Sequence, residues 1–163
     1  TKDQSTINYS YPRLFKGSPW FFGLNGGFER DPFRELKYRY TLSTGIGYDF
    51  WDQARRSFNL ELRGGFQQEE IGGEQQNNSV VGVTMRFRYD IFGDDLELFA
   101  DATFGKAFGD RLYETFVSRT GIRYKMTDYF YANFEIDIDY DSAPPDGVEP
   151  TDVVWVVGIG TDF

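Results

Sequence analysis

The sequence contains neither cysteine nor histidine among its 163 residues. Without cysteine there is no disulfide bond and no thiolate nucleophile. Without histidine the chain lacks the side chain that most often acts as a general base and most often binds transition metals. Ser-His-Asp and Cys-His catalytic arrangements are therefore excluded. We expect a protein that is not an enzyme and binds no cofactor.

Long apolar runs are also missing, and the mean hydropathy is −0.52. A helical membrane protein needs about 20 consecutive, predominantly apolar residues in each span, so this class is disfavoured. A low average hydropathy does not argue against a membrane β-barrel, because only alternate residues of its strands face lipid.

Basic residues are scarce. Lys and Arg total 17 against 26 Asp and Glu, which gives a net charge of −9 at pH 7. Nucleic acid is not expected as a partner, because phosphate binding requires a basic face. No signal peptide is recognisable at the N-terminus, which for a secreted barrel indicates a mature or truncated chain.

The last thirteen residues, TDVVWVVGIGTDF at 151–163, are the stretch around which the chain is organised. Alternate residues of a strand share a face, and this length suits a tilted membrane-spanning strand. The strand ends on a terminal phenylalanine, which resembles the C-terminal signal that the insertion machinery of bacterial outer-membrane barrels reads. The residues that would form this assembly signal are Trp155, Val157, Ile159 and Phe163.

The same alternation of apolar and polar residues recurs along the chain, and no segment has helical periodicity. The pattern predicts a single all-β domain over 1–163, an antiparallel meander of about eight strands that forms a transmembrane β-barrel. Residues 1–16 are expected to be either an edge strand, because Pro12 cannot donate to a ladder, or the remnant of an upstream hairpin. The well-patterned strands are predicted at 20–30, 36–50, 57–67, 81–91, 96–105, 116–126, 130–140 and 151–163.

The connections between these strands alternate in length. Tight turns are predicted at 16–19, 51–55, 92–95 and 126–129, an interruption at 31–34, and polar loops at 69–78, 106–112 and 141–150. Short periplasmic turns and longer outer loops are typical of bacterial outer-membrane barrels. In an eight-stranded barrel, segment 20–30 would pair with the terminal strand and leave 1–15 outside.

Alternation alone does not say which face is the core. A soluble barrel would place its apolar face inward. The reverse is favoured by glycines on the polar face, by aromatic residues near strand ends and by the terminal Phe163. The order of the charges also favours an inward polar face. Neighbouring strands mostly carry charges of opposite sign on this face, and these charges can pair across strands. This charge ladder is expected to line a lumen and consists of Glu61, Arg63, Arg86, Arg88, Glu97, Asp101, Arg119, Arg123, Lys125, Glu135, Asp137 and Asp139. A solvated sheet face could carry the same ladder.

Four stretches resemble one family: ERDPF at 29–33, YRYTLSTGIGY at 38–48, TGIRYKMTD at 120–128 and DYDSAPPDGVEPTD at 139–152. The sequence is similar to the salt-induced outer-membrane protein family, which is catalogued as a domain of unknown function, and covers the C-terminal part of that family's barrel. The resemblance implies an outer-membrane β-barrel and carries over no catalytic residues. Members usually continue upstream, so the front of the barrel is expected to be missing.

Two other interpretations concern the acidic residues. Glu135, Asp137 and Asp139 share a strand face and could act as acid/base groups or bind a cation, but structural pairing with Arg119, Arg123 and Lys125 is favoured. A Ca²⁺ site is conceivable in the last loop, although a solvated acidic loop is favoured. The residues of that conceivable site are Asp139, Asp141, Asp146 and Glu149.

The sequence thus predicts a bacterial outer-membrane β-barrel of no assigned specific role, structural or passively permeable. Its expected partners are outer-membrane lipid and the barrel-assembly machinery. A link to envelope or salt stress follows only from the family name. The alternative is a soluble or periplasmic ligand-binding β-barrel, which would need no detergent.

Overall fold

The computed structural model describes residues 5–14, 17–31, 36–93, 95–127, 129–144 and 147–161, with backbone only for 5–14 and 31. These residues form nine strands and no helix. Hence no helix in the described part of the chain is long and apolar enough to cross a membrane. The strands are β1 (Ser5–Leu14), β2 (Trp20–Asp31), β3 (Leu36–Gln53), β4 (Arg56–Ile71), β5 (Glu74–Ile91), β6 (Leu96–Gly109), β7 (Tyr113–Lys125), β8 (Phe130–Asp141) and β9 (Thr151–Thr161).

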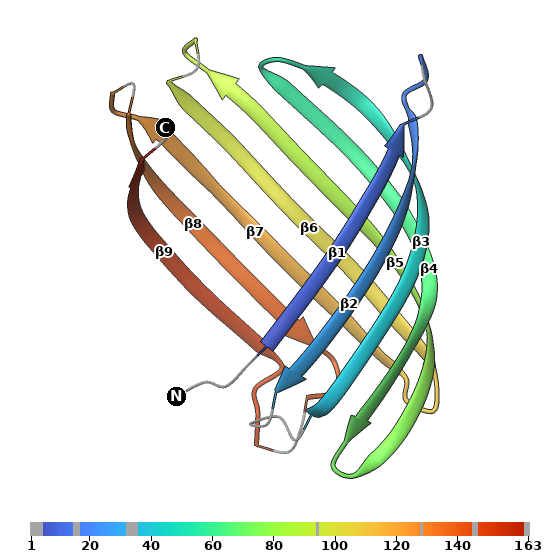
Figure 1. Cartoon of the computed structure of the whole chain (residues 1–163). Coiled ribbons are helices and arrows are strands. Elements are labelled where there is room, and N and C mark those ends of the chain that lie inside the picture. The colour runs from blue at the N-terminus through green and yellow to red at the C-terminus, as the bar shows by residue number, and fades with distance from the viewer. Residues whose placement is uncertain are drawn as a thin grey trace.

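Every strand pairs antiparallel with the next one in the chain, so the strand order in the sheet is β1 to β9. This confirms the predicted all-β antiparallel meander. Figure 1 shows that the sheet is strongly curved, with β1 and β9 at its two edges. No pairing joins these two edge strands in the described part of the chain, so the sheet is not closed there.

The first strand changes the expected arrangement of the edges. β1 pairs with β2 from Ser5↔Arg30 to Leu14↔Phe21, while the other edge of β2 pairs with β3. The eight-strand alternative, in which segment 20–30 would pair with the terminal strand, is therefore wrong. Both edges of β2 are already hydrogen-bonded, and a strand has only two edges.

Two of the predicted polar loops are wrong. At 69–78, β4 continues to Ile71 and β5 begins at Glu74, so only Gly72 and Gly73 connect them. Both glycines have positive φ, 58° and 84°, which a two-residue hairpin turn requires. At 106–112, β6 continues to Gly109 and β7 begins at Tyr113.

These strand ends carry polar residues on both faces, so the alternation of hydropathy stops although the hydrogen-bonded ladder continues. The β4–β5 connection is consequently no longer than Ala54–Arg55 between β3 and β4, and the predicted alternation of short and long connections is wrong at this position. Most of the predicted interruption at 31–34 lies outside the described residues. The tight turns at 92–95 and 126–129 lie between strands, as expected.

Polar side chains are buried on the concave face of the sheet, and apolar ones are exposed on the convex face. In β4, Glu61 and Gln67 are 3% and 8% exposed, whereas Leu62 and Phe66 are 60% and 72% exposed. We call the concave side the inner face and the convex side the outer face. Other buried polar side chains are those of Glu69, Asn78, Thr84 and Ser118.

Glycines on the inner face make room for aromatic rings from the strand beside them. Phe21 lies directly opposite Gly47, and a Cβ atom at Gly47 would overlap the Phe21 ring. Phe99 stands in the same relation to Gly121, where a Cβ would lie 2.6 Å from the ring. A strand glycine often marks such a close approach, which gives several glycines of the polar face a packing role.

Aromatic rings form two groups on the outer face. We call the end of the sheet that holds the β3–β4, β5–β6 and β7–β8 turns the turn end, and the opposite end the loop end. At the loop end, Tyr40 contacts Tyr38 and Phe28 at centroid distances of 5.3 and 5.1 Å. At the turn end, rings follow one another across β2, β3, β4 and β5, with centroids 5.0 to 6.4 Å apart: Trp20–Tyr48, Tyr48–Phe50, Phe50–Phe58, Phe58–Phe87 and Phe87–Tyr89.

Candidate functional site

The predicted charge ladder lies on the inner face, and much of it is paired. Arg88 forms two hydrogen bonds with Asp101, of 3.0 and 2.7 Å, which join β5 to β6. Two parallel N–H···O hydrogen bonds from a planar guanidinium to a planar carboxylate give a well-defined geometry. The other ion pairs of the ladder are Arg63–Glu61 at 3.1 Å, Arg86–Glu61 at 3.7 Å, Arg123–Glu97 at 3.6 Å, Arg119–Glu135 at 3.2 Å and Arg119–Asp137 at 3.5 Å.

Two members of the ladder lie apart from these pairs. Lys125 is the last residue of β7, and its backbone N–H donates to the carbonyl oxygen of Asp95 at 2.8 Å. Asp139 is exposed in β8, where Val117 of β7 and Asp152 of β9 lie opposite it. No ion pair of Asp139 occurs among the described residues, so the ladder ends in an acidic region beside β9.

A second group of charges, which the sequence analysis did not select, lies at the loop end of the inner face. Glu29, Arg39 and Glu69 lie opposite one another on β2, β3 and β4. Arg39 Nη1 is 2.9 Å from Glu29 Oε2, and Arg39 Nη2 is 2.7 Å from Glu69 Oε2. Glu69 has no exposed surface. Residue 69 falls in the predicted polar loop at 69–78. A loop residue has no defined strand partner, so the sequence did not predict that Glu69 pairs with Arg39.

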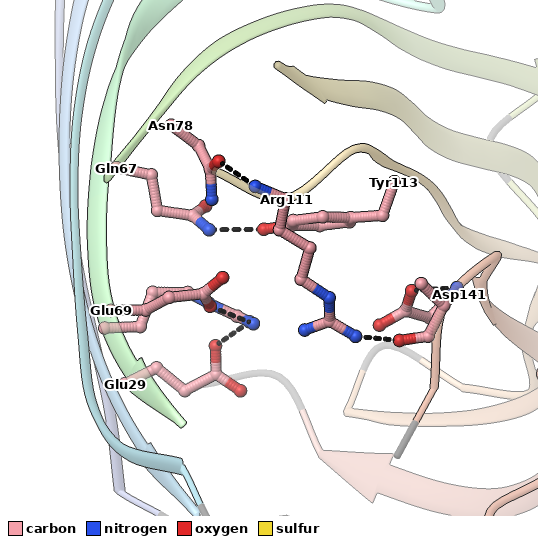
Figure 2. Close-up of polar contacts among 9 residues, drawn as sticks. Glu29, Gln67, Glu69, Asn78, Arg111, Tyr113 and Asp141 are labelled. Carbon is pink, nitrogen blue, oxygen red and sulfur yellow. Dashed lines mark hydrogen bonds and ion pairs between the residues drawn. The ribbon is translucent and has the colours of Figure 1, made fainter. Parts of the chain in front are cut away.

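A second set of hydrogen bonds lies beside this group in the interior, as Figure 2 shows. The Gln67 amide donates to the hydroxyl of buried Tyr113, the first residue of β7. The Arg111 guanidinium lies 5.2 Å from the Tyr113 ring centroid and donates to the carbonyl oxygen of Ala143. Asn78 Oδ1 accepts from the Arg111 backbone N–H at 3.0 Å. We call Glu29, Arg39, Gln67, Glu69, Asn78, Arg111 and Tyr113 the interior network.

The interior network also joins two connections of the sheet to each other. Ser142, just after β8, accepts a hydrogen bond from the Glu114 backbone N–H at 2.7 Å and donates its own backbone N–H to the Glu114 carbonyl at 2.9 Å. Together with the Arg111–Ala143 hydrogen bond, these contacts hold the β6–β7 and β8–β9 connections together. The hydrogen bonds of the network therefore link β4 and β5, through Tyr113 and Arg111, to the β8–β9 connection.

The outer face carries two ion pairs at the level of this network. Lys37 pairs with Glu70 at 3.0 Å, and Lys106 pairs with Glu114 at 2.6 Å. Exposed apolar side chains lie beside these pairs, among them Phe66 and Phe108.

A cavity of about 620 Å³ adjoins the interior network. Residues of seven strands, β2 to β8, line it, which places it on the concave side of the sheet. Arg39 and Tyr113 border it together with Asp139 and Asp141 of β8, and most of its remaining lining residues are small. The interior is therefore not filled by side chains throughout its length.

Three residues of the predicted assembly signal point outward on β9. Trp155, Val157 and Ile159 are 64%, 79% and 75% exposed. Phe163 lies outside the described residues, as does Asp146 of the conceivable Ca²⁺ site. Within the described ranges, no three acidic side chains converge in a way that could hold a metal ion.

These features define the class of the protein: an all-β protein made of one antiparallel meander, with polar and charged side chains inside its curvature and apolar side chains outside. The chain belongs to the family described as "Protein of unknown function, DUF481", whose model matches residues 1–163. This confirms the resemblance to a family of unknown function. No curated protein and no solved structure matches the chain.

Proposed function

We propose that the chain forms an outer-membrane β-barrel whose outer face contacts lipid and whose interior is a polar, partly blocked compartment, which makes it a structural or passively permeable protein. The single observation that carries this proposal is the inverted burial of the sheet. In β4 a buried glutamate, Glu61, is followed by an exposed leucine, Leu62, and buried Gln67 follows exposed Phe66.

Water makes this distribution unfavourable. Each Å² of apolar surface exposed to water costs about 25 cal/mol relative to burial, and soluble monomers rarely expose apolar patches larger than a few hundred Å². Here exposed large apolar residues occur on every strand from β2 to β9, and Leu42, Phe66 and Val157 are more than 60% exposed. Lipid removes this cost. The soluble ligand-binding barrel requires the opposite distribution, so it is not supported.

The spacing of the two aromatic groups agrees with a bilayer. Tyr40 and Tyr48 belong to the loop-end and turn-end groups of β3, and eight residues separate them. Eight residues span about 27 Å along a strand, or roughly 20 Å along the membrane normal at a tilt of about 40°. Outer-membrane barrels carry an apolar band about 25 Å tall between two aromatic girdles. The residues between the two tyrosines on the outer face include Leu42 and Ile46, both exposed.

The interior favours a passive role. The ion pairs of the inner face occupy its charges with one another, and the interior network crosses the compartment at the loop end. Because the network is linked to the β8–β9 connection through the Arg111–Ala143 hydrogen bond, a solute could pass there only if these contacts opened. We therefore propose low permeability in the resting state. The assembly machinery as a partner and the link to salt stress are part of the proposal and rest on the C-terminal pattern and the family resemblance.

Site-directed spin labelling tests the outward assignment. Val157→Cys places a label on the outer face and Val117→Cys places one beside the inner cavity, and these matched valines are 79% and 50% exposed. In lipid vesicles, we expect oxygen to relax the label at 157 and a water-soluble nickel chelate to relax the label at 117. Preferential relaxation by the nickel chelate at 157, or a protein that stays monomeric without detergent, would refute the proposal.

A further inference from the structure

The two edge strands of the sheet run in the same direction. All eight pairings are antiparallel and join neighbours in sequence, from β1–β2 to β8–β9. Strands of odd number are therefore all parallel to one another, which includes β1 and β9. Figure 1 shows both of these strands running from the loop end to the turn end. Each has one hydrogen-bonded neighbour among the described residues.

This common direction limits how the sheet can be completed. Direct pairing of β1 with β9 would form a parallel seam in an otherwise antiparallel sheet. A second copy in the same orientation would present its β1 to this β9, which again gives a parallel seam. A strand that runs from the turn end to the loop end is antiparallel to both edges. Bacterial single-chain barrels have even numbers of antiparallel strands, and one added strand gives ten.

We propose that one added β-strand lies between β1 and β9 and pairs antiparallel with both. The inference rests on the proposed membrane function, because lipid offers no hydrogen-bonding partner to two unpaired strand edges. The added strand must be about as long as its neighbours, which have 10 and 11 residues. On its outer face it would continue the apolar surface of Trp155, Val157 and Ile159.

The charges on the inner face of β8 and β9 indicate which charge the added strand should carry. Asp139 of β8 lies directly opposite Asp152 of β9, and like charges in this position repel. Neither residue forms an ion pair within the part of the chain that the structure describes, whereas Arg119 is paired with Glu135 and Asp137 nearby. A Lys or Arg on the added strand, directed inward near the loop end, would compensate this pair. The fitting partner is thus an alternating strand with one inward cation.

Cysteine crosslinking separates the added strand from a direct seam. In the protein isolated from its membrane, Asn8→Cys on β1 is combined in turn with single cysteines at positions 152 to 158 on β9. Direct pairing brings some Cα atoms within about 6 Å, where a disulfide forms. An intervening strand holds them about 10 Å apart, so only a longer bifunctional reagent should join them. Ile138→Cys with Val153→Cys, which lie directly opposite on β8 and β9, is the positive control.

Hydrogen exchange completes the test. With a strand on its free edge, all β9 amides should be protected, whereas an open edge leaves alternate amides unprotected. A disulfide between β1 and β9, or alternate unprotected amides on β9, would overturn the proposal. Loss of membrane association instead would refute the proposed function itself.

Discussion

Arg39 lies directly opposite Glu69 on neighbouring strands, and its Nη2 atom is 2.7 Å from a carboxylate that has no exposed surface. Breaking a buried ion pair leaves one charge without compensation, which costs about 3–5 kcal/mol. We expect Arg39→Leu to lower the free energy of unfolding by that amount in urea titrations of the vesicle-bound protein.

The matched control is Lys37→Gln. Lys37 also forms a cross-strand ion pair, with Glu70, but its side chain is 69% exposed. Such a pair contributes about 0–1 kcal/mol. The double variant Arg39→Leu/Glu69→Leu should regain part of the stability, since no buried charge is left unpaired at residue 69. Equal effects of Arg39→Leu and Lys37→Gln would contradict the role of burial.

A side chain at position 47 should collide with the Phe21 ring. A Cβ atom there would overlap the ring, so Gly47→Val is expected to destabilise the protein by about 1–3 kcal/mol, as overpacking does. The same unfolding titration checks this. In the double variant, Phe21→Ala should restore part of the stability lost by Gly47→Val, because the free-energy effects of substitutions at two residues that share space are not additive. Gly26→Val is the control, since a Cβ at Gly26 meets nothing within 4 Å.

A charge on the outer face should be costly in lipid. Val157→Arg is expected to lower stability by about 2–4 kcal/mol if the residue lies near the bilayer midplane. Val117→Arg is the matched inner-face variant. Val117 lies opposite Asp139, so an arginine there gains a carboxylate neighbour and should be tolerated. A larger penalty at 117 than at 157 would show that the two faces have been exchanged.

Opening the interior network should raise ion permeability. We expect the unmodified protein to show little conductance in planar bilayers. Arg111→Ala/Tyr113→Ala removes the link to the Ala143 carbonyl and the hydroxyl that accepts from Gln67, and should increase conductance severalfold. Arg56→Ala, which changes an exposed cation at the turn end, should not. Steady large conductance of the unmodified protein would contradict the blocked interior.

The order of the strands and the residues that share a face were accessible from the sequence. Alternation of apolar and polar residues depends on local backbone geometry, in which successive side chains point to opposite sides. It therefore predicted the strands on both sides of the turns at 92–95 and 126–129 and placed Trp155, Val157 and Ile159 on one face of β9. It also grouped oppositely charged residues on neighbouring strands, because consecutive strands of a meander pair.

The continuation of strands through polar sequence was not accessible. The stretch at 69–78 has no apolar face, so its hydropathy looks like that of a loop, yet backbone hydrogen bonds and the Gly72–Gly73 turn make it a hairpin. Glu69 was missed for this reason. Its burial depends on the curvature of the sheet and on side chains from distant strands, which local periodicity does not encode.

The sequence by itself determined that the chain forms antiparallel strands with one polar and one apolar face, because this follows from the two-residue repeat of a strand. Only the tertiary structure decided which charge meets which. Register places Arg39 between Glu29 and Glu69, and Glu61 meets Arg63 of its own strand as well as Arg86. The number of strands likewise decided that β1 and β9 are parallel. These relations depend on register and curvature, which are set by all the strands together.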